Sequence, residues 1–331
     1  MCTAIVFGEK NRYFGRNLDY EMSFGERVVV TPRNFELNFR YLPDIKRHAA
    51  FIGMAAIVDG YPLYYDATNE YGLSIAGLNF VGNCYFSNMA LDMRANLCQF
   101  ELIPYIMARC GTVKEAKTIF ERLNLLGEPF APELPIAQLH WMIADREECC
   151  VLEITRCGVN VFCNKVGVLT NNPPFTFHLD NLNQYRGLTN GNAEVGFGEN
   201  IPYNEFSRGM GAIGLPGDWS SPSRFIRAAF VRANAMQSED ECEKENVAQF
   251  FHILSSVAMV KGCVAVGDSY EFTQYSSCCD TEKGIYYFKT YSDDAQRCVN
   301  MNEYDLQSKS LFDVELSKGD KRRQKYNKLL I

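Results

Sequence analysis

MCTAIVF at residues 1–7 opens the chain, GEKN follows at 8–11, and RYFGRNL returns at 12–18. The first run is predicted to be a buried strand, because it is rich in apolar and β-branched residues and carries no charge. GEKN has the composition of a turn, so the third run is predicted to pair with the first as a hairpin. This hairpin returns Arg16 and Asp19 to the end of the strand at which Cys2 lies.

Cys2 is the candidate nucleophile. Loss of Met1 puts a thiol and a free α-amine on one carbon, so a single residue supplies both the nucleophile and its base. A base is needed because an ordinary thiol, with a pKa of about 8.5, is only slightly ionised at neutral pH. The Asp19 carboxylate can hold the ammonium, and the Arg16 guanidinium favours the thiolate. From the spacing alone, an Arg16–Asp19 ion pair at the surface is the alternative interpretation.

Composition and charge limit the class of protein. The 331 residues are 47% hydrophobic and 22% charged, which is typical of a globular protein with a large core. A net charge of −7 argues against nucleic acid or an anionic membrane as the main partner. No linker, low-complexity tract or repeat divides the chain. We therefore expect one domain over residues 2–317 and a basic C-terminal tail at 318–331 without a functional role.

Cysteine usage predicts the compartment. Thirteen cysteines are an odd number, lack the character of a small secreted disulfide framework, and fit a reducing environment. The N-terminus has no signal-peptide pattern, and no apolar run reaches about 18 residues. The protein is therefore expected to be cytoplasmic. Without a Cys-x-x-Cys motif or paired histidines, neither a metal nor another cofactor is expected.

Strands and helices are predicted in alternating blocks. Predicted strands lie at 51–58, 62–66, 72–80, 139–144, 150–154, 159–162, 166–170, 271–277 and 285–291. Predicted helices lie at 101–109, 112–125, 225–236 and 246–259. This order predicts an α+β fold in which two sheets lie between helical layers.

Two asparagines stand where predicted strands end. Asn79 lies in GLNF at 77–80, and Asn171 lies in TNNP at 170–173, before a proline that interrupts the strand. Either side chain can donate a hydrogen bond to an oxyanion. Either can instead satisfy the backbone of a turn, which is the commoner role of Asn beside Gly or Pro. The residues alone leave both interpretations open.

GLPGDWSSPSR at 214–224 is predicted to be a loop that leads into a helix. Ser221 is the expected N-cap and Pro222 the first helical residue, so Arg224 lies in the first turn. An arginine there opposes the helix dipole, so a countercharge or a bound anion is expected nearby. Phosphate binding is disfavoured, because the loop lacks the lysine of a P-loop.

The order and spacing of these motifs resemble the choloylglycine hydrolase family over about residues 2 to 300. The motifs are Cys2-Thr3, Arg16-Asn17-Leu18-Asp19, Asn79, Thr170-Asn171-Asn172-Pro173 and the segment 214–224. The resemblance implies the four-layer αββα sandwich of the N-terminal nucleophile hydrolases. It also implies a homotetramer, and a Cys2 amine exposed by loss of Met1 alone.

The resemblance further implies a role for each matching residue. Cys2 acts as nucleophile and, through its amine, transfers protons, while Arg16 and Asp19 orient and tune it. The Asn171 side chain and the backbone N–H of Asn79 form the oxyanion hole. The catalytic set implied in this way is completed by Arg224 beside the thiol: Cys2, Arg16, Asp19, Asn79, Asn171 and Arg224.

Asn79 also bears on the substrate, because bile salt hydrolases of this family tend to have Asn there and penicillin V acylases tend to have Tyr. The resemblance therefore implies that the substrates are bile salts conjugated to glycine or taurine. A steroid requires an apolar trough, whose candidate residues are Tyr20, Met22, Phe24, Phe130, Leu134 and Ile136. Core packing is the alternative for these side chains. The proline-rich loop 127–135 favours a pocket wall.

Two other functions stay open. A penicillin V acylase or an N-acyl-homoserine-lactone acylase would use the same Cys2 chemistry with a different acyl pocket. A non-catalytic, Cys-rich thiol- or metal-binding protein, in which Cys2 is incidental, is a remote alternative from another class. Relative turnover of glycocholate, taurocholate and penicillin V distinguishes an acylase from a bile salt hydrolase. Metal analysis tests for the metal-binding protein.

Overall fold

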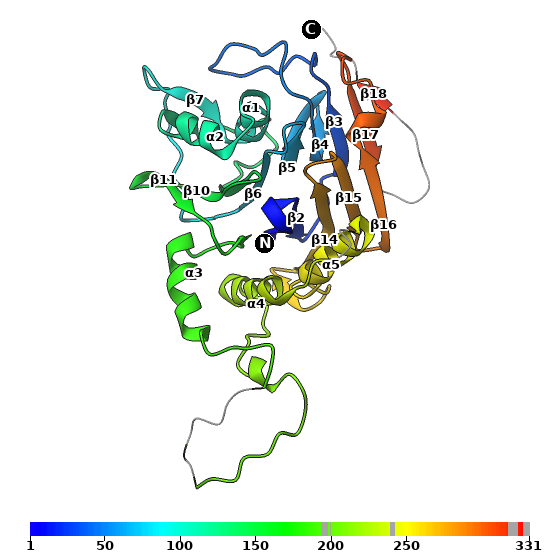
Figure 1. The fold of residues 1–331 in the computed structure, drawn as a ribbon. Coiled ribbons are helices and arrows are strands. Elements are labelled where there is room, and N and C mark those ends of the chain that lie inside the picture. Colours follow the sequence, from blue (N-terminus) through cyan, green and yellow to red (C-terminus); the bar gives the residue numbers. More distant parts are fainter. Residues whose placement is uncertain (193–197, 199, 239–241, 317–323, 327–331) are drawn as a thin grey trace.

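Two large antiparallel sheets form the core of the protein in a computed structural model that describes residues 1–192, 198, 200–238, 242–316 and 324–326 (Figure 1). One sheet has the order β12 (Val168–Leu169), β1 (Cys2–Phe7), β2 (Tyr13–Tyr20), β14 (Ser269–Asp280), β15 (Ile285–Thr290) and β16 (Asp293–Asn300), with β13 (Val264–Val266) also paired to β14. The other has the order β11 (Gly158–Cys163), β10 (Cys149–Thr155), β9 (Leu139–Ala144), β6 (Ser74–Asn79), β5 (Tyr61–Asn69), β4 (Phe51–Val58), β3 (Arg27–Thr31), β17 (Leu311–Glu315) and β18 (Gln324–Tyr326).

Helices cover the outer faces of both sheets. The α-helices are α1 (Leu102–Arg109), α2 (Val113–Phe120), α3 (Phe175–Leu182), α4 (Ser221–Asn234) and α5 (Glu243–Ser255). Figure 1 places α1 and α2 beside the β5–β6 part of the second sheet, and α4 and α5 beside the first. The order helix, sheet, sheet, helix confirms the predicted αββα sandwich.

Strand periodicity explains why both faces of the second sheet are buried. Along β9, Trp141 and Ile143 join the apolar cluster of α1 and α2, whereas Met142 and Ala144 join the cluster between the sheets. A strand that is apolar on both faces reads as a continuous hydrophobic run. This pattern is the one that the sequence shows at 139–144.

The N-terminal hairpin lies in the middle of the first sheet. β1 and β2 pair antiparallel, with Cys2 opposite Leu18 and Ala4 opposite Arg16, and a short 3-10 helix at Glu9–Asn11 makes the turn. β12 pairs with the free side of β1, and β14 pairs with the free side of β2. The predicted hairpin is confirmed, and both of its strands have a partner on each side.

Two expectations differ from the structure, and a third is not tested by it. The helix predicted through Leu125 ends at Phe120, because Leu123–Leu126 forms β8, parallel to β7 (Ala95–Cys98). The N-cap of α4 is Ser220 rather than Ser221, so Arg224 lies at the end of the first turn. The predicted tail at 318–331 lies outside the described residues, apart from 324–326 in β18, and the domain boundary stays a prediction.

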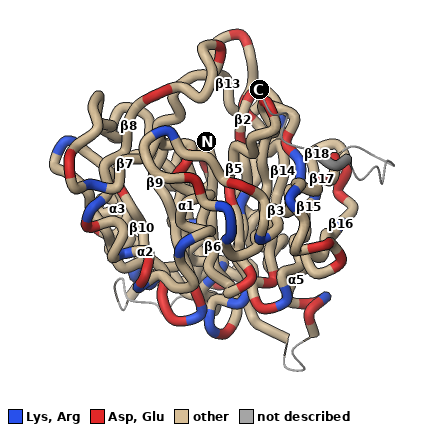
Figure 2. Tube along the Cα trace, turned by 90° about the horizontal axis from the view of Figure 1, so that it is seen from above, with Lys and Arg blue, Asp and Glu red and all other residues tan. Residues whose placement is uncertain are grey.

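The surface and the thiols add three observations. Figure 2 shows Lys and Arg interspersed with Asp and Glu around the molecule. All thirteen cysteines are free thiols. Within the described part of the chain, no helix is long and apolar enough to cross a membrane, and no group of three or more His, Cys, Asp or Glu residues is arranged to hold a metal ion.

Gly15 generates a stability prediction. A Cβ at this position would lie 2.0 Å from the carbonyl oxygen of Ser277 in β14, so only glycine allows the two backbones to approach this closely. Gly15→Ala is therefore expected to lower the free energy of unfolding by about 3 kcal/mol or more, measured by denaturant unfolding. Gly187→Ala is the control, since its Cβ would meet nothing within 4 Å. Equal stability of the two variants would contradict the packing argument.

Candidate active site

Cys2 and Arg16 meet on the face of β1 and β2 that is turned toward the second sheet. Arg16 pairs with Ala4, so its side chain shares a face with that of Cys2 two residues away. Its Nη2 donates to the Cys2 Sγ at 2.6 Å, and its Nη1 donates to the carbonyl oxygens of Gly77 and Tyr65 at 2.5 and 3.0 Å. Both residues are buried. The second sheet thus positions a buried guanidinium that donates a hydrogen bond to the Cys2 sulfur.

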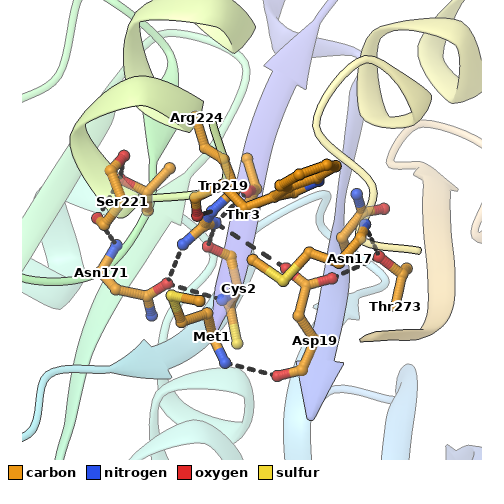
Figure 3. Close-up of polar contacts among 12 residues, drawn as sticks. Met1, Cys2, Thr3, Asn17, Asp19, Asn171, Trp219, Ser221, Arg224 and Thr273 are labelled. Carbon is orange, nitrogen blue, oxygen red and sulfur yellow. Dashed lines mark hydrogen bonds and ion pairs between the residues drawn. The ribbon is translucent and has the colours of Figure 1, made fainter. Parts of the chain in front are cut away.

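Asp19 lies on the opposite face of β2, toward α4 and α5. One carboxylate oxygen, Oδ1, accepts a hydrogen bond from the Thr273 hydroxyl at 2.6 Å. The other, Oδ2, has no hydrogen-bond partner and lies 3.9 Å from Nη1 of Arg224 (Figure 3). Burial raises the pKa of Asp19, and the Arg224 charge opposes that rise. Asp19 is the countercharge that the position of Arg224 predicts.

Arg224 holds the backbone around Cys2 from the helix side. Its Nη1 donates to the Cys2 carbonyl at 2.5 Å and to the Thr3 hydroxyl at 2.7 Å, and its Nε donates to the Trp219 carbonyl at 3.0 Å (Figure 3). Burial lowers the pKa of Arg224, while Asp19 opposes that shift. The structure therefore places Arg224 on the carbonyl oxygen of Cys2, the residue beside whose thiol the sequence predicts it to lie.

Asn171 joins the nitrogen of Cys2 to the end of β6. The Asn171 Oδ1 accepts from the Cys2 N–H at 2.7 Å and from Arg224 Nη2 at 2.8 Å, and its Nδ2 donates to the Asn79 carbonyl at 2.8 Å. These bonds reach across the fold rather than around a local turn. The Phe80 N–H donates to the carbonyl of Gln138, the residue before β9, at 2.8 Å. Because N–H groups alternate in direction along an antiparallel strand, the Asn79 N–H points away from β9.

Met1 precedes Cys2 and occupies part of the site. Its ammonium donates to the Asp19 carbonyl at 2.6 Å and forms an ion pair with Glu271, and burial lowers the pKa of this ammonium. The Cys2 nitrogen is a peptide amide as long as Met1 is attached. Cleavage of the peptide bond between residues 1 and 2 would free this nitrogen beside the Asn171 Oδ1 that it already contacts.

An apolar cavity of about 410 Å³ opens onto Cys2 and Arg16. It is lined by five of the six side chains predicted for the acyl group: Tyr20, Phe24, Phe130, Leu134 and Ile136. Met22 lies outside this lining and is 54% exposed, because β2 ends at Tyr20 and strand alternation no longer directs the side chains that follow.

The cavity also includes residues that the sequence did not single out. Leu63 and Tyr65 come from β5, and Phe100 comes from the segment before α1. The Phe100 ring meets the Phe130 ring edge to face at a centroid distance of 5.2 Å, and Tyr61 stacks on Phe130 at 5.3 Å. The alternation of β5 was the available signal, because it puts Leu63 and Tyr65 on one face.

Comparison with known proteins gives matches along almost the whole chain. Residues 2–314 match the family described as linear amide C-N hydrolases, choloylglycine hydrolase family. A bile salt hydrolase/transferase from Lactiplantibacillus plantarum is 46% identical over 317 residues, which are 96% of this chain and 97% of that protein. A conjugated bile acid hydrolase from Lactobacillus acidophilus is 38% identical and covers 94% of this chain and 99% of its own length.

Solved structures share the fold over the same extent. A mutant of the conjugated bile acid hydrolase from Clostridium perfringens matches with a TM-score of 0.88 at 34% identity, covering 99% of this chain and 98% of its own. A penicillin V acylase from Agrobacterium tumefaciens matches with a TM-score of 0.74 at 19% identity, covering 96% and 92%. At that identity the second match indicates a shared sandwich and nothing finer.

The contact between Arg16 and the thiol predicts the reactivity of Cys2. Arg16→Leu is expected to slow alkylation of Cys2 by iodoacetamide at neutral pH by about 10- to 100-fold, because the thiolate loses a charged hydrogen-bond donor. Mass spectrometry of the Cys2 peptide against time measures the rate. Arg12→Leu, which removes an ion pair with Asp280, is the control. An unchanged rate in Arg16→Leu would contradict the role given to Arg16.

Proposed function

Because this chain belongs to the choloylglycine hydrolase family of linear amide C-N hydrolases, we propose that it hydrolyses the amide bond of bile acids conjugated to glycine or taurine. The relatives that carry such names match nearly the whole chain. The observation that carries the proposal is the apolar cavity, which ends at the Cys2 thiol. A steroid fits such a lining, and the polar residues at the thiol face the scissile amide.

The proposed reaction begins once Met1 has been removed. The Cys2 Sγ attacks the amide carbon, the C–N bond breaks, and the amino acid leaves with a proton relayed by the Cys2 amine. Water then attacks the thioester, which releases the bile acid and restores the thiol. Arg16 supports the thiolate. The Cys2 ammonium is assigned to Asn171 Oδ1, which already accepts from the Cys2 nitrogen, and to Asp19 Oδ2, which accepts no hydrogen bond.

The negative oxygen of each tetrahedral intermediate is assigned to Asn171 and Asn79. The amide group of Asn171 has two N–H donors, and one of them already bonds to the Asn79 carbonyl. The second is free for the substrate oxygen, as is the Asn79 backbone N–H that points away from β9. Donors that are in place before the reaction cost no reorganisation at the transition state.

A second activity follows from the same intermediate. The relatives from Lactiplantibacillus plantarum and Clostridium perfringens are both named bile salt hydrolase/transferase. An amine that replaces water as the attacking group would form a new amide and restore the thiol, with no other reactant needed. We infer that acyl transfer to amines accompanies hydrolysis in this protein.

The cellular setting and assembly form part of the proposal. Thirteen free thiols fit a cytoplasmic enzyme, since a reducing compartment keeps cysteines unpaired. A homotetramer is proposed from the family resemblance. Light scattering of the purified protein tests the assembly independently of activity.

Amide hydrolysis is tested by intact mass, followed by ninhydrin detection of glycine or taurine released from glycocholate and taurocholate. The expected result is a mass lacking Met1, release of the amino acid, and no release by Cys2→Ser. Cys163→Ser, which changes an exposed thiol, is the matched control and is expected to keep full activity. Release in Cys2→Ser would contradict the mechanism. Clearly faster turnover of penicillin V than of both bile salts would contradict the substrate assignment.

The oxyanion assignment predicts unequal effects at the two asparagines. Asn171→Ala removes a side-chain donor and is expected to lower kcat by about 100- to 1,000-fold, equivalent to about 2.7–4 kcal/mol of barrier. Asn79→Ala keeps its backbone N–H and is expected to lose less. Steady-state kinetics measure both variants. A larger loss in Asn79→Ala than in Asn171→Ala would reverse the assignment.

A further inference from the structure

The backbone at Thr170 and Asn171 is held by side chains instead of by a sheet. β12 ends at Leu169, which is the last residue paired with β1. Beyond it, the Asn171 N–H donates to the Ser221 Oγ at 2.8 Å. The Thr170 carbonyl accepts from His140 Nε2 at 3.0 Å, and the Asn171 carbonyl accepts from His178 Nε2 at 2.9 Å. The buried imidazoles of His140 and His178 therefore donate to two successive backbone carbonyls, those of Thr170 and Asn171.

His140 makes a hydrogen bond with each of its ring nitrogens. Its Nε2 faces a carbonyl oxygen, which can only accept, so this nitrogen carries a hydrogen. Its Nδ1 lies 3.0 Å from Glu153 Oε1, and that oxygen also accepts from the Phe175 N–H at 2.9 Å. His140 and Glu153 form a buried hydrogen-bonded pair, with the His140 ring stacked on Phe80 at a centroid distance of 4.3 Å.

His178 has a neutral ring that makes a single hydrogen bond. Burial lowers the pKa of His178 to about 4, so the ring is neutral at neutral pH. Its single hydrogen is on Nε2, because the partner is the Asn171 carbonyl. The other nitrogen, Nδ1, is buried with no hydrogen-bond partner, and the ring stacks on Phe225 at 4.8 Å. The ring thus leaves one polar atom unsatisfied while making one hydrogen bond, and that bond is to Asn171.

We propose that His140 and His178 are positioning residues for the amidase reaction, which hold Asn171 so that its side chain meets Cys2, Arg224 and Asn79 at once. The inference rests on the proposed function of Asn171 at the oxyanion. His140 comes from β9, His178 from α3 and Ser221 from α4, so three elements fix one short segment. Displacing a group at the reacting centre by about 1 Å can cost 100-fold in rate.

A pair of variants at His178 separates the hydrogen bond from packing. His178→Phe keeps an aromatic ring beside Phe225 but removes the donor, whereas His178→Gln puts an N–H donor where Nε2 lies. We expect His178→Phe to lower kcat by about 10- to 100-fold with KM changed by less than about twofold. His178→Gln is expected to restore kcat to within about threefold of the wild type.

His48 provides the structural control. It is buried, and its two ring nitrogens lie 2.7 and 2.8 Å from the carbonyl oxygens of Ala49 and Phe35, remote from the catalytic residues. His48→Phe is expected to lower the melting temperature and to keep kcat at a temperature where the protein is folded. Wild-type kcat in His178→Phe, failure of His178→Gln to restore it, or an equal loss of kcat in His48→Phe would overturn the proposal.

A crystal structure of His178→Phe tests the geometry without a substrate. The Asn171 side chain is expected to leave hydrogen-bond distance of the Cys2 nitrogen, and an unmoved side chain would overturn the positioning role. If the wild type hydrolysed no amide, the proposed function would fail, whereas this structural comparison would still decide the positioning role.

Discussion

The contact between the Arg16 guanidinium and the Cys2 sulfur is the interaction on which the site depends. A fully buried guanidinium is costly unless its hydrogen bonds are satisfied. Here the sulfur satisfies one, and the carbonyls of Gly77 and Tyr65 satisfy others from the facing sheet. The two sheets must therefore pack in one relative position for Arg16 to be buried at all. The same position aligns the thiol with the cavity.

Around this contact the buried charges alternate in sign. Arg224 faces Asp19 on the helix side of β1 and β2. Between the sheets, Asp66 accepts hydrogen bonds from the hydroxyls of Tyr275 at 3.2 Å and Tyr286 at 2.7 Å. Burial raises the pKa of Asp66, and the charge of Arg16 opposes that rise. Each buried cation thus has a buried carboxylate near it, which limits the desolvation cost of a site this polar.

The sequence predicted those parts of the fold that depend on residues close together along the chain. The N-terminal hairpin and the strands at 51–58 and 139–144 follow from apolar runs bounded by turn residues. The helix expected through Leu125 was wrong, because Leu123 and Leu125 satisfy both a helical and a strand period. Only the parallel pairing with β7, some thirty residues earlier, selects the strand.

The site was predictable to the extent that its chemistry resides in side chains. The motifs named Cys2, Arg16, Asp19, Asn171 and Arg224, and the structure brings these five residues together around one backbone segment. The buried carboxylate of Asp66 was not named, because nothing in its sequence context distinguishes it from other strand residues. Backbone groups such as the Gly77 carbonyl gave no signal, since every residue has one. Histidines that act through a carbonyl also gave none. Their importance depends on which loop the fold brings beside them.

The place of the hairpin between β12 and β14 has a consequence for the order of folding. β1 leaves the ribosome before the other strands described here, yet its outer neighbour begins at Val168, and the neighbour of β2 begins at Ser269. Pairings this distant in sequence pay a large loop-closure entropy and form late. During synthesis the apolar strand that carries Cys2 therefore keeps an unpaired edge until β12 has been made, and β2 keeps one until β14 has been made. The catalytic centre is completed only after β14, which supplies the Thr273 hydroxyl to Asp19, has been made.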